Sequence, residues 1–142
     1  MTDLKKLALD ILSQGYLVSL GTMDQGGVWV SDIVYTYDDN LNIYWVSNPS
    51  VRHSQALTVK PAVAATITLE AGPGKPNIGL QISGVAESVE ETREIREGYA
   101  AKRQRTYEEA VRPGVGWYRL APKVIEVIYE PLFGWEKQKI EL

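Results

Sequence analysis

Short apolar segments separated by turn sequences constrain the fold of this chain more than any other feature. Residues 16–23 and 28–37 are rich in apolar, β-branched and aromatic residues, and Asp24-Gln25-Gly26-Gly27 separates them. Glycines accept positive φ angles, so this sequence is typical of a tight hairpin turn. A second turn signal at residues 38–40 is followed by another strand-like run at 42–47. The pattern predicts an antiparallel meander rather than a parallel sheet.

The rest of the chain adds further strands and three helices. Strands are expected at residues 62–70, 78–87, 117–120 and 124–129, and a tail is expected at 130–142. Helices are expected at residues 4–12, at 51–59 with Ser50 as N-cap, and from a capping box at Ser88–Glu91 to about residue 111. A chain of 142 residues has the size of one domain, which is expected to span residues 1–142. We therefore predict a mainly β fold with flanking helices, in which six or seven antiparallel strands form a closed or partly closed barrel.

Charge and composition exclude several classes of function. The net charge is −3, whereas a nucleic-acid binder needs a concentrated basic face, so no nucleic-acid partner is expected. The chain has no cysteine and only one histidine, His53, so thiolate catalysis is excluded and no metal site is predicted. There is no signal-peptide pattern and no apolar stretch of the ~18 residues that a membrane span needs, so a cytoplasmic protein without a membrane partner is expected. Demanding chemistry would have to come from a cofactor.

Four segments in a fixed order carry a resemblance to a known family. They are Ile43–Ser54, which is an aromatic strand followed by serines and an arginine, then Lys60–Ala64, Ile82–Glu87, and a last hairpin within Tyr118–Tyr129. In their order and spacing they resemble the pyridoxamine 5'-phosphate oxidase-like, FMN-binding split barrels, and the similarity covers roughly residues 10–130. The closing Leu132–Lys137 is similar to a small bacterial branch of that superfamily. The resemblance implies an FMN-binding split β-barrel that works as a homodimer, with the flavin at the interface.

The start of the predicted helix at 51–59 is a candidate phosphate site. A helix N-terminus offers free main-chain N–H groups and about half a positive charge. Arg52, His53 and Ser54 lie in the first turn of this helix, and Ser47 comes shortly before it. Arg52 would bind a phosphate through paired hydrogen bonds, and a phosphate nearby would favour the charged form of His53. The alternative is a solvated helix start with a surface histidine.

The resemblance implies that the flavin ring lies against the strand at 28–37. The residues that it implies for the ring are Val30, Ser31, Asp32, Ile33 and Val34. Val46, from the following strand, is a further candidate for cofactor binding. Asp32 is then either a residue beside the ring or an exposed residue on a barrel edge. The true oxidases have Arg-Lys where this chain has Arg52-His53, and their C-terminal segment rich in Trp and Arg has no match here. The resemblance therefore implies flavin binding more strongly than oxidation of pyridoxamine phosphate.

The predicted function is that of an FMN-binding flavoprotein, a flavin-dependent oxidoreductase that acts on a small-molecule substrate. Three alternatives stay open: a non-catalytic flavin- or haem-binding protein for storage or sensing, a deazaflavin-dependent reductase, and a structural dimer without a cofactor. The sequence offers no general acid or base beyond Asp32 and His53. Trp135, close to Lys137 in the tail, is either a core or interface residue or a residue that stacks on a ligand.

Overall fold

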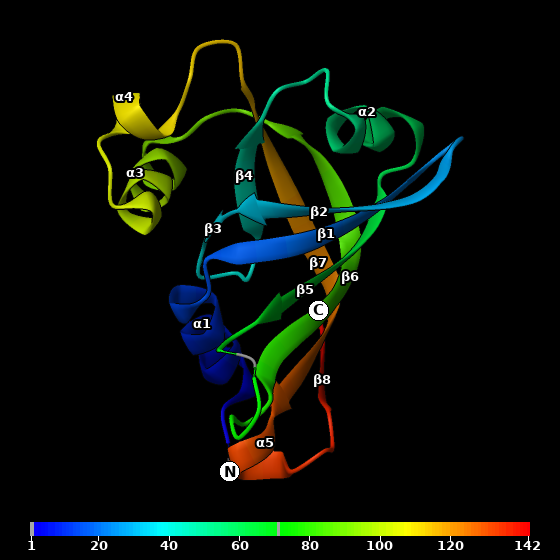
Figure 1. Cartoon of the computed structure of the whole chain (residues 1–142), viewed down its shortest axis with the longest axis vertical. Coiled ribbons are helices and arrows are strands. Elements are labelled where there is room, and N and C mark those ends of the chain that lie inside the picture. The colour runs from blue at the N-terminus through cyan, green and yellow to red at the C-terminus, as the bar shows by residue number, and fades with distance from the viewer. Residues whose placement is uncertain (1, 71) are drawn as a thin grey trace.

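The computed structural model describes residues 2–70 and 72–142 as a curved antiparallel sheet with helices around it (Figure 1). The helices of this part of the chain are α1 (Leu4–Gln14), α2 (Arg52–Val59), α3 (Arg93–Arg103), α4 (Tyr107–Ala110) and α5 (Glu130–Phe133). The strands are β1 (Leu17–Asp24), β2 (Gly27–Val34), β3 (Thr36–Tyr37), β4 (Ile43–Ser47), β5 (Ala62–Thr68), β6 (Ile78–Val89), β7 (Gly116–Tyr129) and β8 (Gln138–Glu141).

The strands form one sheet in the order β2-β1-β5-β6-β7-β4-β3, and β8 pairs with β7 beside this path. Each pair of neighbours is antiparallel. The two ends of the order, β2 and β3, belong to one chain segment and are separated only by Tyr35. The bend at Tyr35 therefore curls the sheet round on itself. This architecture is a split barrel with flanking helices, so the predicted fold class is confirmed.

Alternating side chains of the strands fill the inside of the barrel. In β5, Val63, Ala65 and Ile67 are buried and the residues between them are exposed. The largest fully buried side chains of the barrel include Leu20, Ile43, Trp45, Leu80, Leu120 and Ile125. Helix α1 adds Ala8, Ile11 and Leu12 to the same core. The core is thus continuous from the first helix to the last long strand.

Two side chains from distant parts of the sequence hold the C-terminal end of α1. The hydroxyl of Tyr35 donates to the carbonyl oxygen of Leu12 over 2.7 Å. Nζ of Lys102, from α3, donates to the carbonyl oxygens of Leu12 and Gly15 over 2.9 and 2.6 Å. A cation at the C-terminal end of a helix also interacts favourably with the helix dipole. These contacts fasten α1 and α3 to the bend in the barrel wall.

Helices α3 and α4 stand beside the barrel and enclose a second hydrophobic cluster (Figure 1). Ile95, Tyr99 and Ala110 pack there on Trp117 of β7, and the Tyr99 and Trp117 rings meet edge to face with centroids 5.5 Å apart. Gly98 lets α3 approach the barrel closely, because a Cβ atom at this position would lie 2.6 Å from Oγ1 of Thr36 in β3.

The predicted helix from Ser88 to about residue 111 is wrong at its start and in its continuity, whereas its end agrees with the end of α4 at Ala110. Strand β6 continues to Val89, which pairs with Trp117, so Ser88 forms no cap. The helix begins after Thr92, whose hydroxyl accepts the N–H of Ile95. Gln104 adopts a left-handed conformation with φ of 51° and separates α3 from α4. Strand pairing with β7 outweighs the local capping signal.

Three further expectations differ from the structure. Strand β7 is continuous where two strands were expected, because Pro122 lies at a register shift opposite Gly84 and does not end the pairing with β6. The expected tail forms α5 and β8, and β8 pairs with Val124–Val127 of β7. Ser50 is not the N-cap of α2: its hydroxyl donates to Oδ1 of Asn48, and Val51 occupies the N-cap position.

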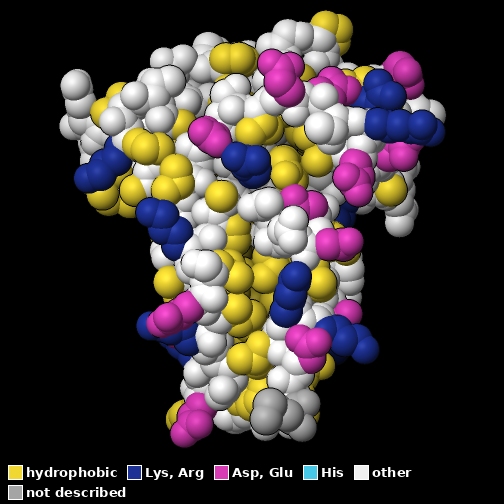
Figure 2. All heavy atoms as spheres, turned by 180° about the vertical axis from the view of Figure 1, so that it is seen from behind, with side chains coloured by type: hydrophobic (Ala, Val, Ile, Leu, Met, Phe, Trp, Pro, Cys, Tyr) yellow, Lys and Arg dark blue, Asp and Glu magenta, His cyan; other side chains and the backbone are white. Residues whose placement is uncertain are grey.

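The surface carries hydrophobic and charged side chains in a mixed arrangement. Seen from behind (Figure 2), hydrophobic side chains gather along the middle of the narrow lower half, and basic and acidic side chains are interspersed around them. This face therefore shows charges of both signs rather than a patch of one sign. None of the helices in the described ranges has the length and apolar character needed to cross a membrane.

Candidate functional site

The N-terminus of α2 leaves two main-chain donors without partners. The helix begins at Arg52, and Val51 in the N-cap position offers no side-chain acceptor. The N–H groups of Ser54 and Gln55 donate to the carbonyl oxygen of Val51. Within residues 2–70 and 72–142, no acceptor is found for the N–H of Arg52 or of His53. Free donors at the positive end of the helix dipole can bind an anion.

Ser47 and His53 lie side by side next to these donors. Ser47 ends β4, and its Oγ is 2.8 Å from Nε2 of His53. The imidazole is partly buried, and this burial lowers the pKa of His53 below its ordinary value. The neutral imidazole is therefore favoured in the unliganded protein, whereas an anion at the α2 N-terminus would favour the charged form.

Arg52 reaches towards the β1–β2 hairpin. Its Nε and Nη2 donate to the two carboxylate oxygens of Asp24 over 2.9 and 3.0 Å, and its guanidinium lies over the Trp29 ring, 4.3 Å from the centroid. These hydrogen bonds with Arg52 are the main reason why the pKa of Asp24 lies below its usual range. A guanidinium has five N–H donors, so several remain for another ligand.

An open cavity of about 450 Å³ lies beside this ion pair. Asp24, Gln25, Gly26, Arg52 and Val59 line it. The hairpin turn comes very close to the guanidinium, because a Cβ atom on Gly26 would lie 2.9 Å from Nη2 of Arg52. The cavity therefore gives a ligand access to Arg52 from the side of the hairpin.

Ser54 does not share this environment. Its side chain is buried, and its Oγ has no hydrogen-bond partner among the described residues. It lines a separate cavity of about 250 Å³ together with Pro49 and Ser88, and neither Arg52 nor His53 lines that cavity. The predicted phosphate residues thus fall into a Ser47–His53 pair, an arginine held by the hairpin, and a serine that lies elsewhere.

Strand β2 is an edge strand. It pairs along Gly27–Val34 with β1 and has no strand on its other side in the order of the sheet. The free edge of such a strand presents main-chain N–H and C=O groups, which can bind the edge of a planar heterocycle. Val30 is 62% exposed, Ser31 is half-buried, and Ile33 points into the core with 9% exposure.

The predicted ring residues and the start of α2 lie on neighbouring elements. Trp29 of β2 stacks on Arg52 of α2, and Val34 of β2 belongs with Val46 of β4 to the cluster around Trp117. Asp32 is exposed, and its carboxylate accepts a hydrogen bond from Ser19, its partner across β1 and β2. The side chain of Asp32 therefore points towards β1 and away from the free edge of β2.

Local sequence patterns do not assign Asp24 and Trp29 to this site. They predict a turn residue at Asp24 and a core or interface residue at Trp29. No spacing rule connects either of them to Arg52, which follows Asp24 by 28 positions. Only the docking of the hairpin onto α2 brings the three side chains together.

The pyridoxamine 5'-phosphate oxidase family model matches residues 4–129. The chain therefore belongs to the pyridoxamine 5'-phosphate oxidase family. A comparison with curated proteins finds no match.

Several solved structures share the fold. A haem-binding protein from Mycobacterium smegmatis is 14% identical with a TM-score of 0.80, and the match covers 99% of this chain and 59% of that chain. General Stress Protein 26 from Bacillus anthracis is 14% identical with a TM-score of 0.74, and the match covers 99% of this chain and 100% of that chain. HutZ, the haem storage protein from Vibrio cholerae, is 20% identical with a TM-score of 0.64 over 85% of this chain and 91% of that chain.

Proposed function

We propose that this protein binds FMN and acts, as a homodimer, as a flavin-dependent oxidoreductase on a small-molecule substrate. The observation that carries the proposal is the uncapped start of α2, which lies beside the Ser47–His53 pair and next to the edge strand β2. Family membership supports it, since flavin binding is common in the family. The Arg52-His53 pair, in place of Arg-Lys, argues against a true pyridoxamine phosphate oxidase.

The FMN phosphate would bind at the start of α2. The main-chain N–H groups of Arg52 and His53, the hydroxyl of Ser47 and the imidazole of His53 supply donors, and the remaining donors of Arg52 add a planar cationic group. Ser54 would lie in the first turn without donating to the phosphate, because its N–H already donates to the carbonyl oxygen of Val51 and its hydroxyl is buried. This donor set suits one terminal phosphate.

The ring would lie along the free edge of β2, from Val30 to Val34, with Val46 close to it. Main-chain groups of the alternate residues that face the free edge of β2 would meet the polar edge of the ring, and Val30 would offer an apolar contact. Bound FMN supplies hydride or electron transfer, and the protein binds and orients it. The substrate would then approach the exposed face of the ring, where a small planar molecule fits best.

Titration of the protein with FMN, followed by flavin fluorescence, tests the proposal. Arg52→Ala is expected to weaken binding about tenfold to a hundredfold, because a charge-assisted contact to the phosphate is lost. Asp24→Asn is the matched control, since it also breaks the Asp24–Arg52 ion pair but keeps the guanidinium. It is expected to bind FMN as tightly as the wild type or more tightly. Equal weakening in both variants would assign the effect to the hairpin and refute the phosphate site.

A second copy of the chain would cover the outer face of the β1–β2 hairpin. Met23 and Val28 are partners across the two strands and are 42% and 73% exposed, and Val30 beside them is 62% exposed. Contiguous exposed apolar side chains of this kind are typical of an interface. The mass in solution, measured by light scattering, should be that of a dimer, and Val28→Glu should shift it towards the monomer. A wild-type monomer would contradict this part of the proposal.

Haem binding is the second candidate. Two structural relatives are named as haem-binding and haem storage proteins, and this chain has one imidazole, His53, in a partly buried position where the neutral form is favoured. A neutral imidazole nitrogen is a suitable iron ligand. Titration with haemin should give a sharp Soret band that His53→Ala abolishes. A Soret band unchanged by this substitution would remove His53 as the ligand.

A further inference from the structure

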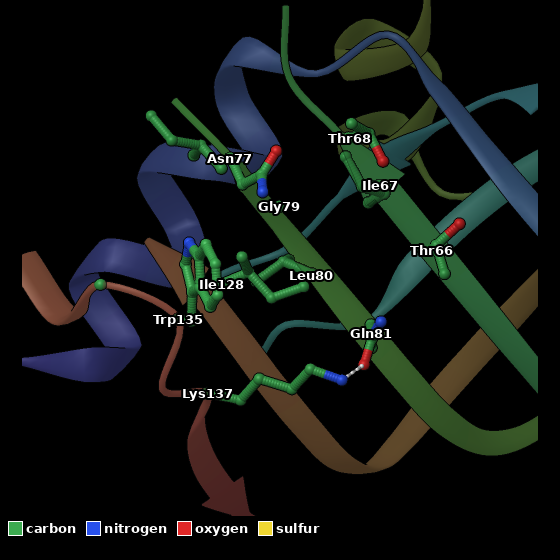
Figure 3. A pocket seen from close by; sticks show the side chains of 12 residues that line it. Thr66, Ile67, Thr68, Asn77, Gly79, Leu80, Gln81, Ile128, Trp135 and Lys137 are labelled. Atoms are coloured by element: carbon green, nitrogen blue, oxygen red, sulfur yellow. Dashed lines mark hydrogen bonds between the residues drawn. The ribbon is translucent and has the colours of Figure 1, made fainter. Parts of the chain in front are cut away.

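A cavity of about 370 Å³ opens on the outside of the barrel at the end far from α2. Figure 1 shows α2 at the top of the molecule and α5 at the bottom, and Gly134, directly after α5, lines the cavity. Strand β6 forms its floor, β5 and β7 flank it, and the link from α5 to β8 forms one wall (Figure 3). The volume lies within the ~300–1,000 Å³ of small-molecule sites.

Trp135 forms the aromatic part of this wall. Its side chain is 91% exposed, which makes it the most exposed large hydrophobic residue of the described chain. The close-up draws Trp135 on the side of the cavity formed by the link from α5 to β8 (Figure 3). A tryptophan in water gives up the favourable burial of its large apolar surface. An exposed indole at the rim of a cavity is well placed to stack on a flat ligand.

Lys137 adds a positive charge to the same wall. Its Nζ donates to Oε1 of Gln81 over 2.9 Å, so the ammonium is held over the floor and keeps two further donors (Figure 3). Among the described residues that line the cavity, Lys137 is the only one with a charge. Glu130 binds the main-chain N–H of Asn77 and does not line the cavity.

The opposite wall offers hydroxyl groups. Thr66 and Thr68 of β5 are exposed on the outer face of the sheet, and Thr66 lies opposite Gln81 in the strand register. A threonine hydroxyl can donate to an anion or to a neutral acceptor. The cavity thus combines one aromatic surface, one cation and a row of neutral hydrogen-bonding groups.

We propose that this cavity binds a planar aromatic molecule that carries a single carboxylate or sulfonate group. The ring stacks on Trp135, and the anionic group meets Lys137 with the hydroxyl of Thr66 nearby. One cation matches one anionic group, so a ligand with several phosphates is disfavoured. The inference is independent of the flavin proposal, because none of the residues proposed to bind the FMN phosphate lines this cavity.

The test uses 2-naphthoate as the probe and the indole N–H signals of the ¹⁵N-labelled protein. The four tryptophans give separate signals, and Trp135→Phe assigns the one from Trp135. Because Trp135 is so exposed, this variant should fold normally. Addition of 2-naphthoate should shift the Trp135 signal saturably. The neutral 2-naphthamide should bind about two- to fivefold more weakly, as expected for loss of one partly exposed charge pair.

Matched variants show whether binding of the probe depends on this cavity. Lys137→Met should weaken 2-naphthoate binding about two- to fivefold. Lys139→Met removes an exposed lysine of β8 that does not line the cavity, and it should bind like the wild type. Arg52→Ala should leave the titration unchanged. Equal binding of the acid and the amide, or equal effects of the two lysine variants, would overturn the proposal. A Trp135 signal that moves with protein concentration and not with the probe would also overturn it, because a second copy would then cover the cavity.

Discussion

Protonation of His53 should couple FMN binding to pH. In the unliganded protein, burial lowers the pKa of His53, and its Nε2 lies 2.8 Å from the hydroxyl of Ser47. A phosphate at the start of α2 would favour the imidazolium and raise this pKa. FMN should therefore bind most tightly where His53 is charged, and its affinity should fall as the pH rises through the pKa of His53 in the complex.

The size of the effect follows from Coulomb's law. Two unit charges about 4 Å apart interact by roughly 4 kcal/mol at an effective dielectric constant of about 20. The imidazole is only partly buried, and counterions screen the exposed part of the site, so about 1.4–2.8 kcal/mol should remain. This range corresponds to a tenfold to hundredfold change in the dissociation constant of FMN.

The assay is an FMN titration at a series of pH values between about 5 and 9, on the wild type and on His53→Gln. The FMN phosphate itself ionises with a pKa of about 6, and the pH dependence that this causes is common to both proteins. It therefore cancels in the ratio of the two dissociation constants. The wild type should bind FMN more tightly than His53→Gln at acidic pH, and this difference in affinity should vanish at alkaline pH. Riboflavin, which has no phosphate, should give a ratio that does not depend on pH. A constant ratio for FMN, or the same pH dependence for riboflavin, would refute the reasoning.

Two predictions concern the frame that positions the site. Tyr35→Phe removes a buried hydroxyl that donates to Leu12, and since Lys102 also donates to that carbonyl, the free energy of unfolding should fall by only about 1 kcal/mol in urea denaturation; a loss several times larger would show that Lys102 does not satisfy the carbonyl. Gly98→Ala places a Cβ atom 2.6 Å from Oγ1 of Thr36 and should lower the free energy of unfolding by about 1–3 kcal/mol. Adding Thr36→Ala should recover part of that loss in thermal unfolding, and a purely additive double variant would contradict the steric explanation.

The sequence by itself determined the elements whose signals are local. The glycines of the 24–27 turn give a hairpin, and Gly27 has a φ of 110°. The alternation of small and β-branched residues at 62–68 gives a strand with one buried face. The helical spacing at 4–12 gives α1, with Asp3 as its N-cap. These patterns suffice because each depends on a period of two or 3.6 residues, or on one turn.

The sequence also predicted a candidate phosphate site. A strand end, a serine and a basic helix start are adjacent in the chain, so Ser47 and His53 meet through local geometry. The family resemblance added the flavin and the ring residues. Local signals failed at Ser50 and Ser88, where both serines had good capping sequences, because Asn48 and strand β7 offered better partners.

The tertiary structure alone decided how the barrel closes and where the side chains of the site point. Tyr35 lies between β2 and β3, which are the two ends of the sheet. No local pattern marks this break, because the sequence at 28–37 predicts a single strand. The contact of Arg52 with Asp24 and Trp29 requires the hairpin to fold over α2. The wall formed by Trp135 and Lys137 requires β8 to pair with β7. The contacts of Arg52 with Asp24 and of Lys137 with Gln81 join residues far apart in the sequence, so they form only when the whole sheet has curled and packed.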